Sequence, residues 1–221
     1  RAQRESGSLM IEFDAVSKTY ANGVEAVREL SLTVAEGETL VLLGSSGCGK
    51  TTTMKMVNRL IQPTSGAIRI RGTDIMDHPV IELRRGIGYA IQHVGLFPHM
   101  TVSENIAVVP HLLRWDARRI AKRCDELLSL VGLDPEQFRH RYPNQLSGGQ
   151  RQRIGVARAL AADPPIVLMD EPFGALDPIT REQLQDESLN LESEIHKTVL
   201  FVTHDIFEAV KMADRIALLD E

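Results

Sequence analysis

The sequence predicts an α/β fold with a parallel sheet, because short apolar runs alternate along the chain with segments of helical character. Three runs carry this prediction, at residues 39–43, 166–169 and 198–203. Each is short and nearly continuous, which is typical of a strand covered on both faces. At 221 residues, the chain can bury the core of one domain with a subdomain.

The first of these runs is followed by a loop and a helical pattern. Residues 39–43 lead into a glycine-rich loop at residues 44–51, and residues 51–60 then carry helix formers. Residues 67–71 alternate apolar and charged side chains before Gly72, which predicts a strand of a half-exposed sheet. The loop is therefore expected between a buried strand and a helix.

The middle of the chain is predicted to be mainly helical. Asp116 is placed to cap an amphipathic helix that ends before Gly132. Its apolar side chains recur at three- and four-residue steps and are Ala117, Ile120, Cys124, Leu127 and Val131. We expect a helical insert over residues 95–160, which separates the glycine-rich loop from a later pair of acidic residues.

Composition limits the classes of function. The net charge of −5 argues against a surface built for non-specific binding of nucleic acid, and we expect no nucleic-acid partner. No apolar run approaches the roughly 18 residues that cross a bilayer, so a membrane role would require a partner. The two cysteines, Cys48 and Cys124, favour a reducing cytosol over a disulfide framework.

Both ends of the sequence look edited. Residues 1–9 are polar and precede Met10, so we expect a tag or linker remnant with Met10 as the native start. The apolar run at residues 216–219 is typical of a strand, and the sequence stops at Glu221. We therefore expect a truncated C-terminus.

The strongest motif is the glycine-rich loop, which reads Gly-Ser-Ser-Gly-Cys-Gly-Lys-Thr over residues 44–51. Glycines let successive backbone amides point inward as an anion nest, and the following helix adds the positive end of its dipole. Lys50 would reach the β- and γ-phosphates of a nucleotide, and the Thr51 hydroxyl would bind Mg²⁺. The predicted ATP-binding residues of this segment are Gly44, Ser45, Ser46, Gly47, Cys48, Gly49, Lys50, Thr51 and Thr52.

A pair of carboxylates follows the apolar run at residues 166–169. Asp170 ends that strand, where a carboxylate can hold Mg²⁺ through water at the carboxyl edge of a parallel sheet. Glu171 comes next and is placed to polarise the water that attacks a phosphate. Alone, an Asp-Glu-Pro sequence also fits a solvated strand end; beside a phosphate loop, the metal and catalytic roles are favoured.

A second glycine-rich segment, Leu-Ser-Gly-Gly-Gln at residues 146–150, stands just before a helical pattern at residues 151–160. Its amides and hydroxyl are suited to a γ-phosphate at a helix entry, although a flexible hinge would use the same residues. One chain carries one nucleotide cradle, so a second phosphate-binding element suggests that two copies close around shared ATP.

These motifs resemble those of the ATP-binding subunit of ABC transporters, and the resemblance runs from Met10 to the end of the chain. Residues 44–51 match the Walker A motif, residues 166–170 the Walker B motif and residues 146–150 the signature motif of the family. The resemblance implies a P-loop NTPase fold of ABC type. Such a fold has a RecA-like parallel-sheet core, an N-terminal antiparallel β part and a helical subdomain.

The resemblance also implies domain boundaries. An ABC ATP-binding domain would span residues 10–221, with a catalytic core at residues 10–94 and 161–221. The helical subdomain with the signature motif would span residues 95–160.

Further site residues follow from the resemblance. Tyr20 falls where the family stacks an aromatic ring on adenine, and Gln92 falls on the glutamine that helps to ligate Mg²⁺ and senses the membrane partner. His204 falls on the histidine that contacts the γ-phosphate, and Asp177 lies in the segment called the D-loop. The implied catalytic residues are Glu171, His204 and Lys50, and the implied Mg²⁺ ligands are Thr51, Gln92 and Asp170.

The mechanism implied by the resemblance is a head-to-tail homodimer that closes on ATP and opens after hydrolysis. The signature motif of one copy would face the Walker A motif of the other. The implied contacts in trans are Ser147, Gly148, Gly149, Gln150 and Asp177. Further implications are permease subunits as partners, an indirect link to a substrate-binding protein, and a peripheral location on the cytoplasmic face of the cell membrane.

Finer similarities indicate the importers of quaternary-amine osmoprotectants, such as glycine betaine, choline, carnitine and proline betaine. They lie at Trp115 and in residues 51–60, 92–101, 105–110 and 173–180. One departure is His93, where that subgroup often has Gln. The resemblance thus implies an ATPase that powers osmoprotectant import, with an importer for an amino acid or a polyamine as the alternative.

Other classes share part of the pattern. A DNA-handling ATPase of the repair type has the same motifs, but it would insert a long coiled coil or a zinc module where this insert is compact. A GTPase or small-molecule kinase would explain the phosphate loop alone, and the Asn-Lys-x-Asp guanine motif is missing. A regulatory binding module would tolerate loss of Glu171 or His204, and both are present.

Overall fold

The computed structural model describes residues 8–91, 95–174, 181–182, 185 and 197–220. The chain divides into two compact units, which are residues 1–84 with 197–221 and residues 85–196. Within the described ranges, no helix combines the length and the apolar character needed to cross a membrane.

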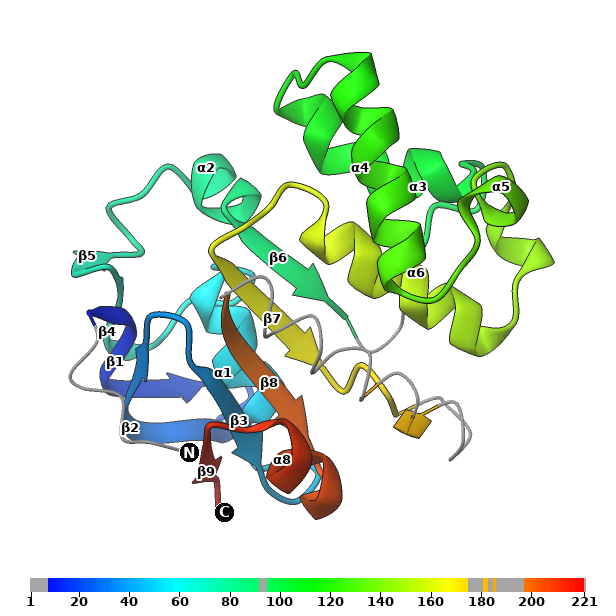
Figure 1. The fold of residues 1–221 in the computed structure, drawn as a ribbon. Coiled ribbons are helices and arrows are strands. Elements are labelled where there is room, and N and C mark those ends of the chain that lie inside the picture. The colour runs from blue at the N-terminus through cyan, green and yellow to red at the C-terminus, as the bar shows by residue number, and fades with distance from the viewer. Residues whose placement is uncertain (1–7, 92–94, 175–180, 183–184, 186–196, 221) are drawn as a thin grey trace. The chain divides into compact units, whose positions relative to one another are not determined.

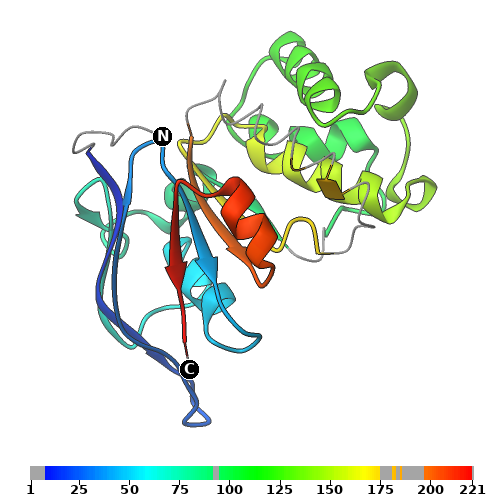
Figure 2. The same cartoon turned by 60° about the horizontal axis from the view of Figure 1, so that its bottom comes forward.

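An antiparallel sheet opens the first unit. Its strands are ordered β2-β1-β4-β5, and Figure 2 shows β1 and β2 as two long, curved neighbours in blue. Their bounds are Leu9–Thr19 for β1, Glu25–Ala35 for β2, Ser65–Ile70 for β4 and Thr73–Asp74 for β5. Arg71 and Gly72 connect β4 to β5 with positive φ of 49° and 78°, the backbone of a tight two-residue hairpin. The strand predicted at residues 67–71 therefore ends one residue early.

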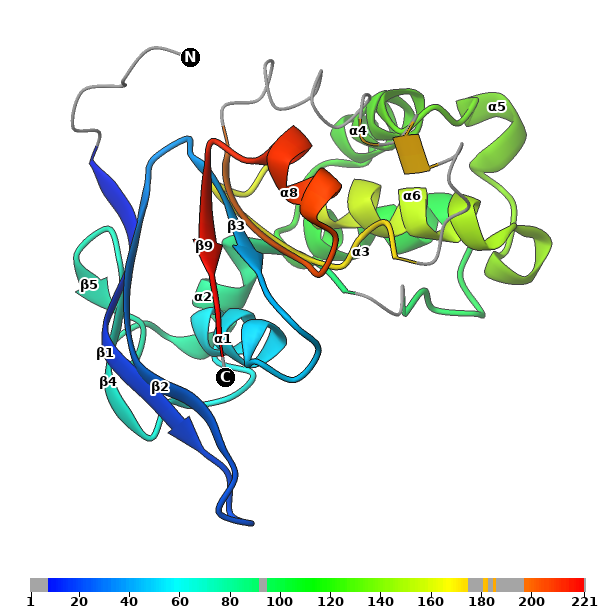
Figure 3. The same ribbon diagram turned by 90° about the horizontal axis from the view of Figure 1, so that it is seen from below.

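A set of parallel strands carries the glycine-rich loop in the same unit. β3 (Thr39–Leu43) lies between β8 (Thr198–Thr203) and β9 (Arg215–Leu218) and is parallel to both. β8 is buried throughout and β3 at all but its last residue, which confirms the prediction from their apolar runs. α1 (Lys50–Val57) packs on β8, and α8 (Ile206–Met212) packs on β3 and β8. Figure 3 shows α8 beside β3 and β9.

The helix predicted over residues 51–60 ends early, because its last turn is closed by a backbone motif. Asn58 is the C-cap, and Arg59 adopts a left-handed conformation with φ of 53°. From there the Leu60 amide returns to the Lys55 carbonyl at 3.0 Å, as in a Schellman motif. The helix-forming residues at positions 51–60 did not indicate that the helix ends at Val57.

The second unit combines two parallel strands with a cluster of helices. β6 (Ile87–Ala90) pairs with β7 (Ile166–Asp170). α6 (Gly148–Leu160) packs on β6, while α3 (Val102–Leu112) and α4 (Ala117–Leu130) pack on α6 and on each other. Figure 1 shows these three helices gathered together. Further short helices are α2 (Val80–Arg85), α5 (Pro135–Phe138) and the 3₁₀ helix η1 (Pro143–Gln145).

Each unit has its own apolar core. Among the most deeply buried large side chains of the first unit are Phe13 on β1, Leu40 on β3 and Phe201 on β8. In the second unit they include Ile106 on α3 and Phe173 after β7. The buried positions thus come from both the strands and the helices of the two units.

The amphipathic helix predicted over residues 116–131 is confirmed as α4. Asp116 is its N-cap and accepts the amide of Arg119 at 2.9 Å. Gly132 follows its end with φ of 66°, the left-handed conformation expected after a helix. The wider helical subdomain predicted at residues 95–160 falls inside the second unit, and its boundaries stay a prediction.

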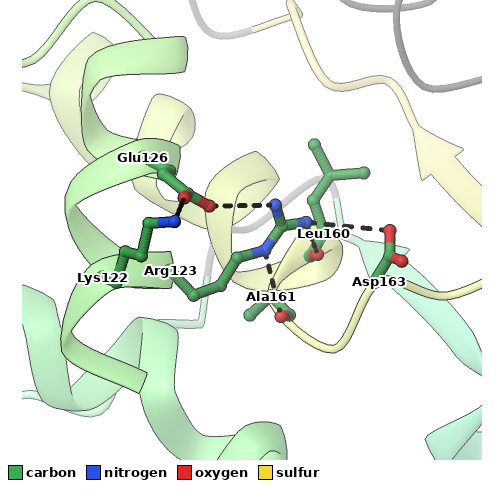
Figure 4. Close-up of polar contacts among 6 residues, drawn as sticks. All are labelled: Lys122, Arg123, Glu126, Leu160, Ala161 and Asp163. Atoms are coloured by element: carbon green, nitrogen blue, oxygen red, sulfur yellow. Dashed lines mark hydrogen bonds and ion pairs between the residues drawn. The ribbon is translucent and has the colours of Figure 1, made fainter. Parts of the chain in front are cut away.

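An arginine on α4 caps the carboxyl end of α6. The Arg123 guanidinium donates to the carbonyl oxygens of Leu160 at 3.0 Å and Ala161 at 3.4 Å (Figure 4). Its ion pairs with Glu126 and Asp163 are longer, at 3.7 and 3.9 Å. Because a cation also complements the negative end of a helix dipole, Arg123 ties α6 to α4.

Candidate nucleotide-binding site

The glycine-rich loop joins β3 to α1, and its glycines are required by geometry. Gly47 and Gly49 have φ of 96° and 93°, a left-handed conformation that is strained for residues with a Cβ. A Cβ on Gly49 would also lie 2.2 Å from the Ala26 carbonyl oxygen, and one on Gly44 would lie 2.4 Å from the Leu219 carbonyl oxygen. Substitution would therefore deform the loop.

Lys50 begins α1 and is buried. Its ammonium donates to the carbonyl oxygens of Gly44 at 2.8 Å and Ser45 at 2.5 Å, and it lies 3.5 Å from the sulfur of Cys48. The side chain thus curls back over the loop that precedes it. The loop thus keeps a charged donor within reach of a bound phosphate.

An aromatic side chain lies beside the first turn of α1. The hydroxyls of Tyr20 and Thr52 are 3.2 Å apart, and the Lys18 ammonium is 5.5 Å from the centre of the Tyr20 ring. The ring is partly exposed, and Thr51 is half-buried next to Thr52. A partly exposed ring in this position suits stacking on a nucleobase.

Asp170 ends β7 in the second unit and is buried. The hydroxyl of Tyr89, on β6, donates to an Asp170 carboxylate oxygen at 3.4 Å. Burial, reinforced by the charge of Asp170, raises the pKa of Tyr89 well above its usual 10.0, so the phenol remains protonated at neutral pH. Tyr89 therefore acts as a donor that orients the carboxylate.

Glu171 follows directly and has φ of 45°. A left-handed backbone is uncommon for a residue other than glycine, and such strain concentrates at functional sites. The Glu171 carbonyl accepts the Gly174 amide at 3.1 Å, which closes a tight turn. The chain thus bends sharply at the second of the two predicted site carboxylates.

His204 is exposed and lies between the end of β8 and the start of α8. Its neighbours on both sides are held by hydrogen bonds. The Thr203 hydroxyl accepts the Asp205 amide at 3.0 Å, and the Asp205 carboxylate accepts the Phe207 amide at 2.8 Å. Asp205 is the N-cap of α8, so the turn that carries the histidine is part of a helix start.

The signature motif forms the start of α6 rather than a segment ahead of it. Ser147 is the N-cap, and Gly148 and Gly149 already lie in the first turn. The Ser147 hydroxyl accepts the Gln150 amide at 3.2 Å, and the Gln150 side-chain oxygen accepts the Ser147 amide at 3.0 Å. This reciprocal pair is a capping box. The helix start predicted at residue 151 is therefore wrong by three residues.

The predicted site residues are distributed over both units. Tyr20, residues 44–52 and His204 belong to the first unit, and Asp170, Glu171 and residues 147–150 belong to the second. Gln92 and Asp177 lie outside the described residues. The roles of all these residues stay predictions.

Two polar contacts were missed from the sequence. Tyr89 gives no signal, because a tyrosine in a short apolar run is usually a packing residue. The contact between Thr203 and Glu208 was also missed, although the Asp-x-x-Glu spacing at residues 205–208 is a helix-start signal. That spacing could have located the start of α8.

The sequence and the fold together identify the family. Residues 27–174 match the ABC transporter family, and the chain belongs to it.

Curated relatives include the choline transport ATP-binding protein OpuBA of Bacillus subtilis (strain 168). It is 58% identical over 210 residues, which cover 95% of this chain and 55% of OpuBA. The glycine betaine uptake system ATP-binding protein YehX of Escherichia coli (strain K12) is 54% identical over 211 residues, which cover 96% of this chain and 68% of YehX. The predicted similarity to osmoprotectant importer ATPases is confirmed, and the chain spans about half the length of relatives such as OpuBA.

The fold is also similar to a solved structure of an ATP-binding cassette, MJ0796, in a dimeric post-hydrolysis state bound to ADP and Pi. The TM-score is 0.86 at 37% identity, over 96% of this chain and 94% of that chain. The predicted α/β fold of ABC type, with parallel strands and an N-terminal antiparallel sheet, is therefore confirmed.

Proposed function

We propose that this chain binds and hydrolyses ATP and thereby powers an importer for quaternary-amine osmoprotectants. The observation that carries the proposal is the glycine-rich loop with Lys50 bonded over it, in a chain 58% identical to a choline transport ATP-binding protein. A further relative, from Bacillus subtilis (strain 168), is named for glycine betaine, carnitine and choline transport and is 57% identical. These names support the cargo class.

In the proposed binding mode, the triphosphate lies in the loop at residues 44–51. Backbone amides of the loop donate to the phosphates, and Lys50 turns from the Gly44 and Ser45 carbonyls to the β- and γ-phosphate oxygens. Tyr20 stacks on adenine, and its hydrogen bond to Thr52 fixes the ring beside α1.

We propose Thr51, Gln92 and Asp170 as the Mg²⁺ ligands, as the family resemblance implies. A hydroxyl, an amide oxygen and a carboxylate are hard oxygen ligands, and few protein ligands suffice because Mg²⁺ keeps waters and substrate phosphates. When bound, the ion neutralises charge that develops on the phosphates. The bond from Tyr89 holds one Asp170 oxygen and so orients the carboxylate.

The hydrolytic step depends on positioning and electrostatics rather than on covalent catalysis. Glu171 accepts a hydrogen bond from the attacking water and orients it toward the γ-phosphorus. Lys50 and His204 donate to γ-phosphate oxygens and stabilise the charge that they gain.

A second copy completes each site in this proposal. Residues 147–150 of one copy would donate to the γ-phosphate held by the other, and the resemblance implies a role for Asp177 at the same interface. The dimeric state of the similar cassette MJ0796 supports this arrangement. Permease subunits would hold the dimer on the cytoplasmic face of the membrane, and a substrate-binding protein would deliver the cargo.

The catalytic assignment is tested with Glu171→Gln. The amide keeps the size of the side chain but no longer attracts a proton from water, so ATP still binds while turnover nearly ceases and an ATP-bound dimer accumulates. ATPase assays and size-exclusion chromatography with light scattering, both in Mg-ATP, measure the two effects. Glu136→Gln, on α5, is the matched control. A Glu171→Gln variant that hydrolyses ATP at the normal rate shows that the assignment is wrong.

The cargo is tested separately, with the chain assembled on its permease. Glycine betaine or choline, presented on the binding protein, is expected to stimulate ATP hydrolysis. If only an amino acid or a polyamine stimulates hydrolysis, the proposed cargo is wrong, whereas the ATPase assignment still stands.

A further inference from the structure

A buried threonine–glutamate pair underlies the turn that carries His204. Thr203 is the last residue of β8 and is 1% exposed, and Glu208 lies in the first turn of α8 and is 4% exposed. The Thr203 hydroxyl donates to a Glu208 carboxylate oxygen at 2.5 Å. A carboxylate is buried at little cost only when it has such partners.

The same hydroxyl also accepts the Asp205 amide at 3.0 Å. Asp205 in turn accepts the amides of Phe207 at 2.8 Å and Glu208 at 3.3 Å. In an ordinary capping box, the glutamate of the first turn accepts the N-cap amide directly. Here the Thr203 hydroxyl stands between the two, so the helix start is bonded to the last residue of β8.

This connection also relates the turn to the phosphate loop. Thr203 pairs with Leu43, the last residue of β3, in the parallel register of the two strands. Gly44 and His204 therefore leave the sheet from paired positions at the same carboxyl edge. Contacts that fix the backbone at Thr203 therefore also fix the position of the His204 backbone relative to the phosphate loop.

We propose that Thr203 and Glu208 are positioning residues for His204, an inference that rests on the proposed contact of His204 with the γ-phosphate. His204 is exposed, whereas the pair beneath it is buried. A donor stabilises a transition state only if it is held in place before the reaction. The buried hydroxyl of Thr203 and carboxylate of Glu208 fix the backbone of the turn, and thereby the position of His204.

The inference is tested by ATPase kinetics of the full chain. Thr203→Val keeps the shape of the side chain but removes the hydroxyl, and with it the hydrogen bonds of Thr203 to the Asp205 amide and the Glu208 carboxylate. We expect kcat to fall ~10- to ~100-fold, since a misplacement on the order of 1 Å costs about 100-fold. The KM for ATP stays within about twofold, because ground-state binding is unchanged.

Conservative variants separate positioning from general damage. Thr203→Ser keeps the hydroxyl and is expected to recover most of the lost kcat. Glu208→Gln keeps an oxygen acceptor and is expected to lose less than Glu208→Ala, so this pair carries the test if Thr203→Val does not fold. Val210→Ala, on the exposed side of α8 at 70% exposure, is the matched control.

A His204→Ala background gives the decisive comparison. If the pair acts through His204, Thr203→Val causes no further loss of kcat in that background. An unchanged kcat in Thr203→Val, a higher KM alone, or a further loss in the background would each overturn the inference. Normal turnover by His204→Ala alone would instead contradict the proposed function, so the two failures are distinguishable.

Discussion

Gly47 and Gly49 share a left-handed backbone but differ in their surroundings. Their φ values are 96° and 93°. A Cβ on Gly47 would meet no heavy atom within 4 Å, whereas one on Gly49 would lie 2.2 Å from the Ala26 carbonyl oxygen of β2. Gly47 is therefore required by backbone conformation alone, and Gly49 by conformation and by close packing.

This difference predicts unequal effects on stability. Gly47→Ala is expected to lower the free energy of unfolding by about 1 kcal/mol, the strain of a left-handed alanine. Gly49→Ala is expected to lower it by ~3 kcal/mol or more, because the loop or β2 must also move. Urea denaturation without nucleotide measures both, and equal losses would contradict the assigned cause.

Single residues show where prediction from the sequence stops. The phosphate-loop residues are predicted because their pattern is local. Its glycines are required by the backbone, and Lys50 and Thr51 have side-chain roles. The bonds of Lys50 to Gly44 and Ser45, and the contact of Tyr89 with Asp170, depend on side-chain conformations and on strand pairing. No sequence spacing encodes those contacts.

For the secondary-structure elements, too, sequence patterns predict some features, while local hydrogen bonds set others. β3 and β8 are predicted to the residue, since their apolar runs stop sharply, at Gly44 after β3 and at His204 after β8. The end of α1 is not, because backbone bonds beyond Asn58 set it. The start of α6 was missed, although Ser147 and Gln150 have the Ser-x-x-Gln spacing of a capping box. Patterns thus predict the existence of an element better than its boundaries.

The packing of α4 on α6 is predicted to depend on Arg123. Arg123→Ala removes two hydrogen bonds to the end of α6 and is expected to destabilise the chain by about 1 kcal/mol, since the side chain is only 21% exposed. Lys122→Ala removes an ion pair of an 82% exposed side chain with Glu126 (Figure 4) and is expected to cost about 0.3 kcal/mol. Thermal unfolding measures both variants, and a larger loss for Lys122→Ala would contradict this order.

The start of α3 is predicted to weaken in acid. The backbone and hydroxyl bonds from Thr101 lower the pKa of Glu104 below its usual 4.5. A carboxyl with a lowered folded pKa stabilises the fold above its unfolded pKa, and this contribution is lost as pH falls through the folded pKa. The melting temperature should therefore drop more steeply below about pH 4.5 in the native chain than in Glu104→Gln. Identical pH profiles for the two proteins would show that the capping box formed by Thr101 and Glu104 is not the cause.

The whole molecule brings together residues that are distant in the sequence. Leu43 and Thr203 pair in parallel strands, and so do Tyr89 and Leu168. The sequence predicted β3, β7 and β8 but not β6. The order and register of the strands arise from packing of the complete chain. The resemblance to a family implied a parallel-sheet core and an antiparallel β part, but not the order of their strands.

Ligand binding should stabilise the molecule as a whole. A ligand that binds only the folded state adds about 2.7 kcal/mol at 100 times its Kd. Mg-ATP is therefore expected to raise the melting temperature of the native chain and to leave that of Lys50→Ala unchanged. A shift of equal size in both proteins would show that the stabilisation does not depend on the phosphate loop.

The bonds of Lys50 to its own loop have a consequence for selectivity. The Gly44 and Ser45 carbonyls compete with every incoming anion for the Lys50 ammonium. The measured free energy of anion binding is therefore reduced by the free energy needed to break these two hydrogen bonds. A single weakly charged group displaces two carbonyl oxygens poorly, whereas adjacent phosphates can replace both at once. We therefore expect the loop to prefer a diphosphate or triphosphate group over free phosphate.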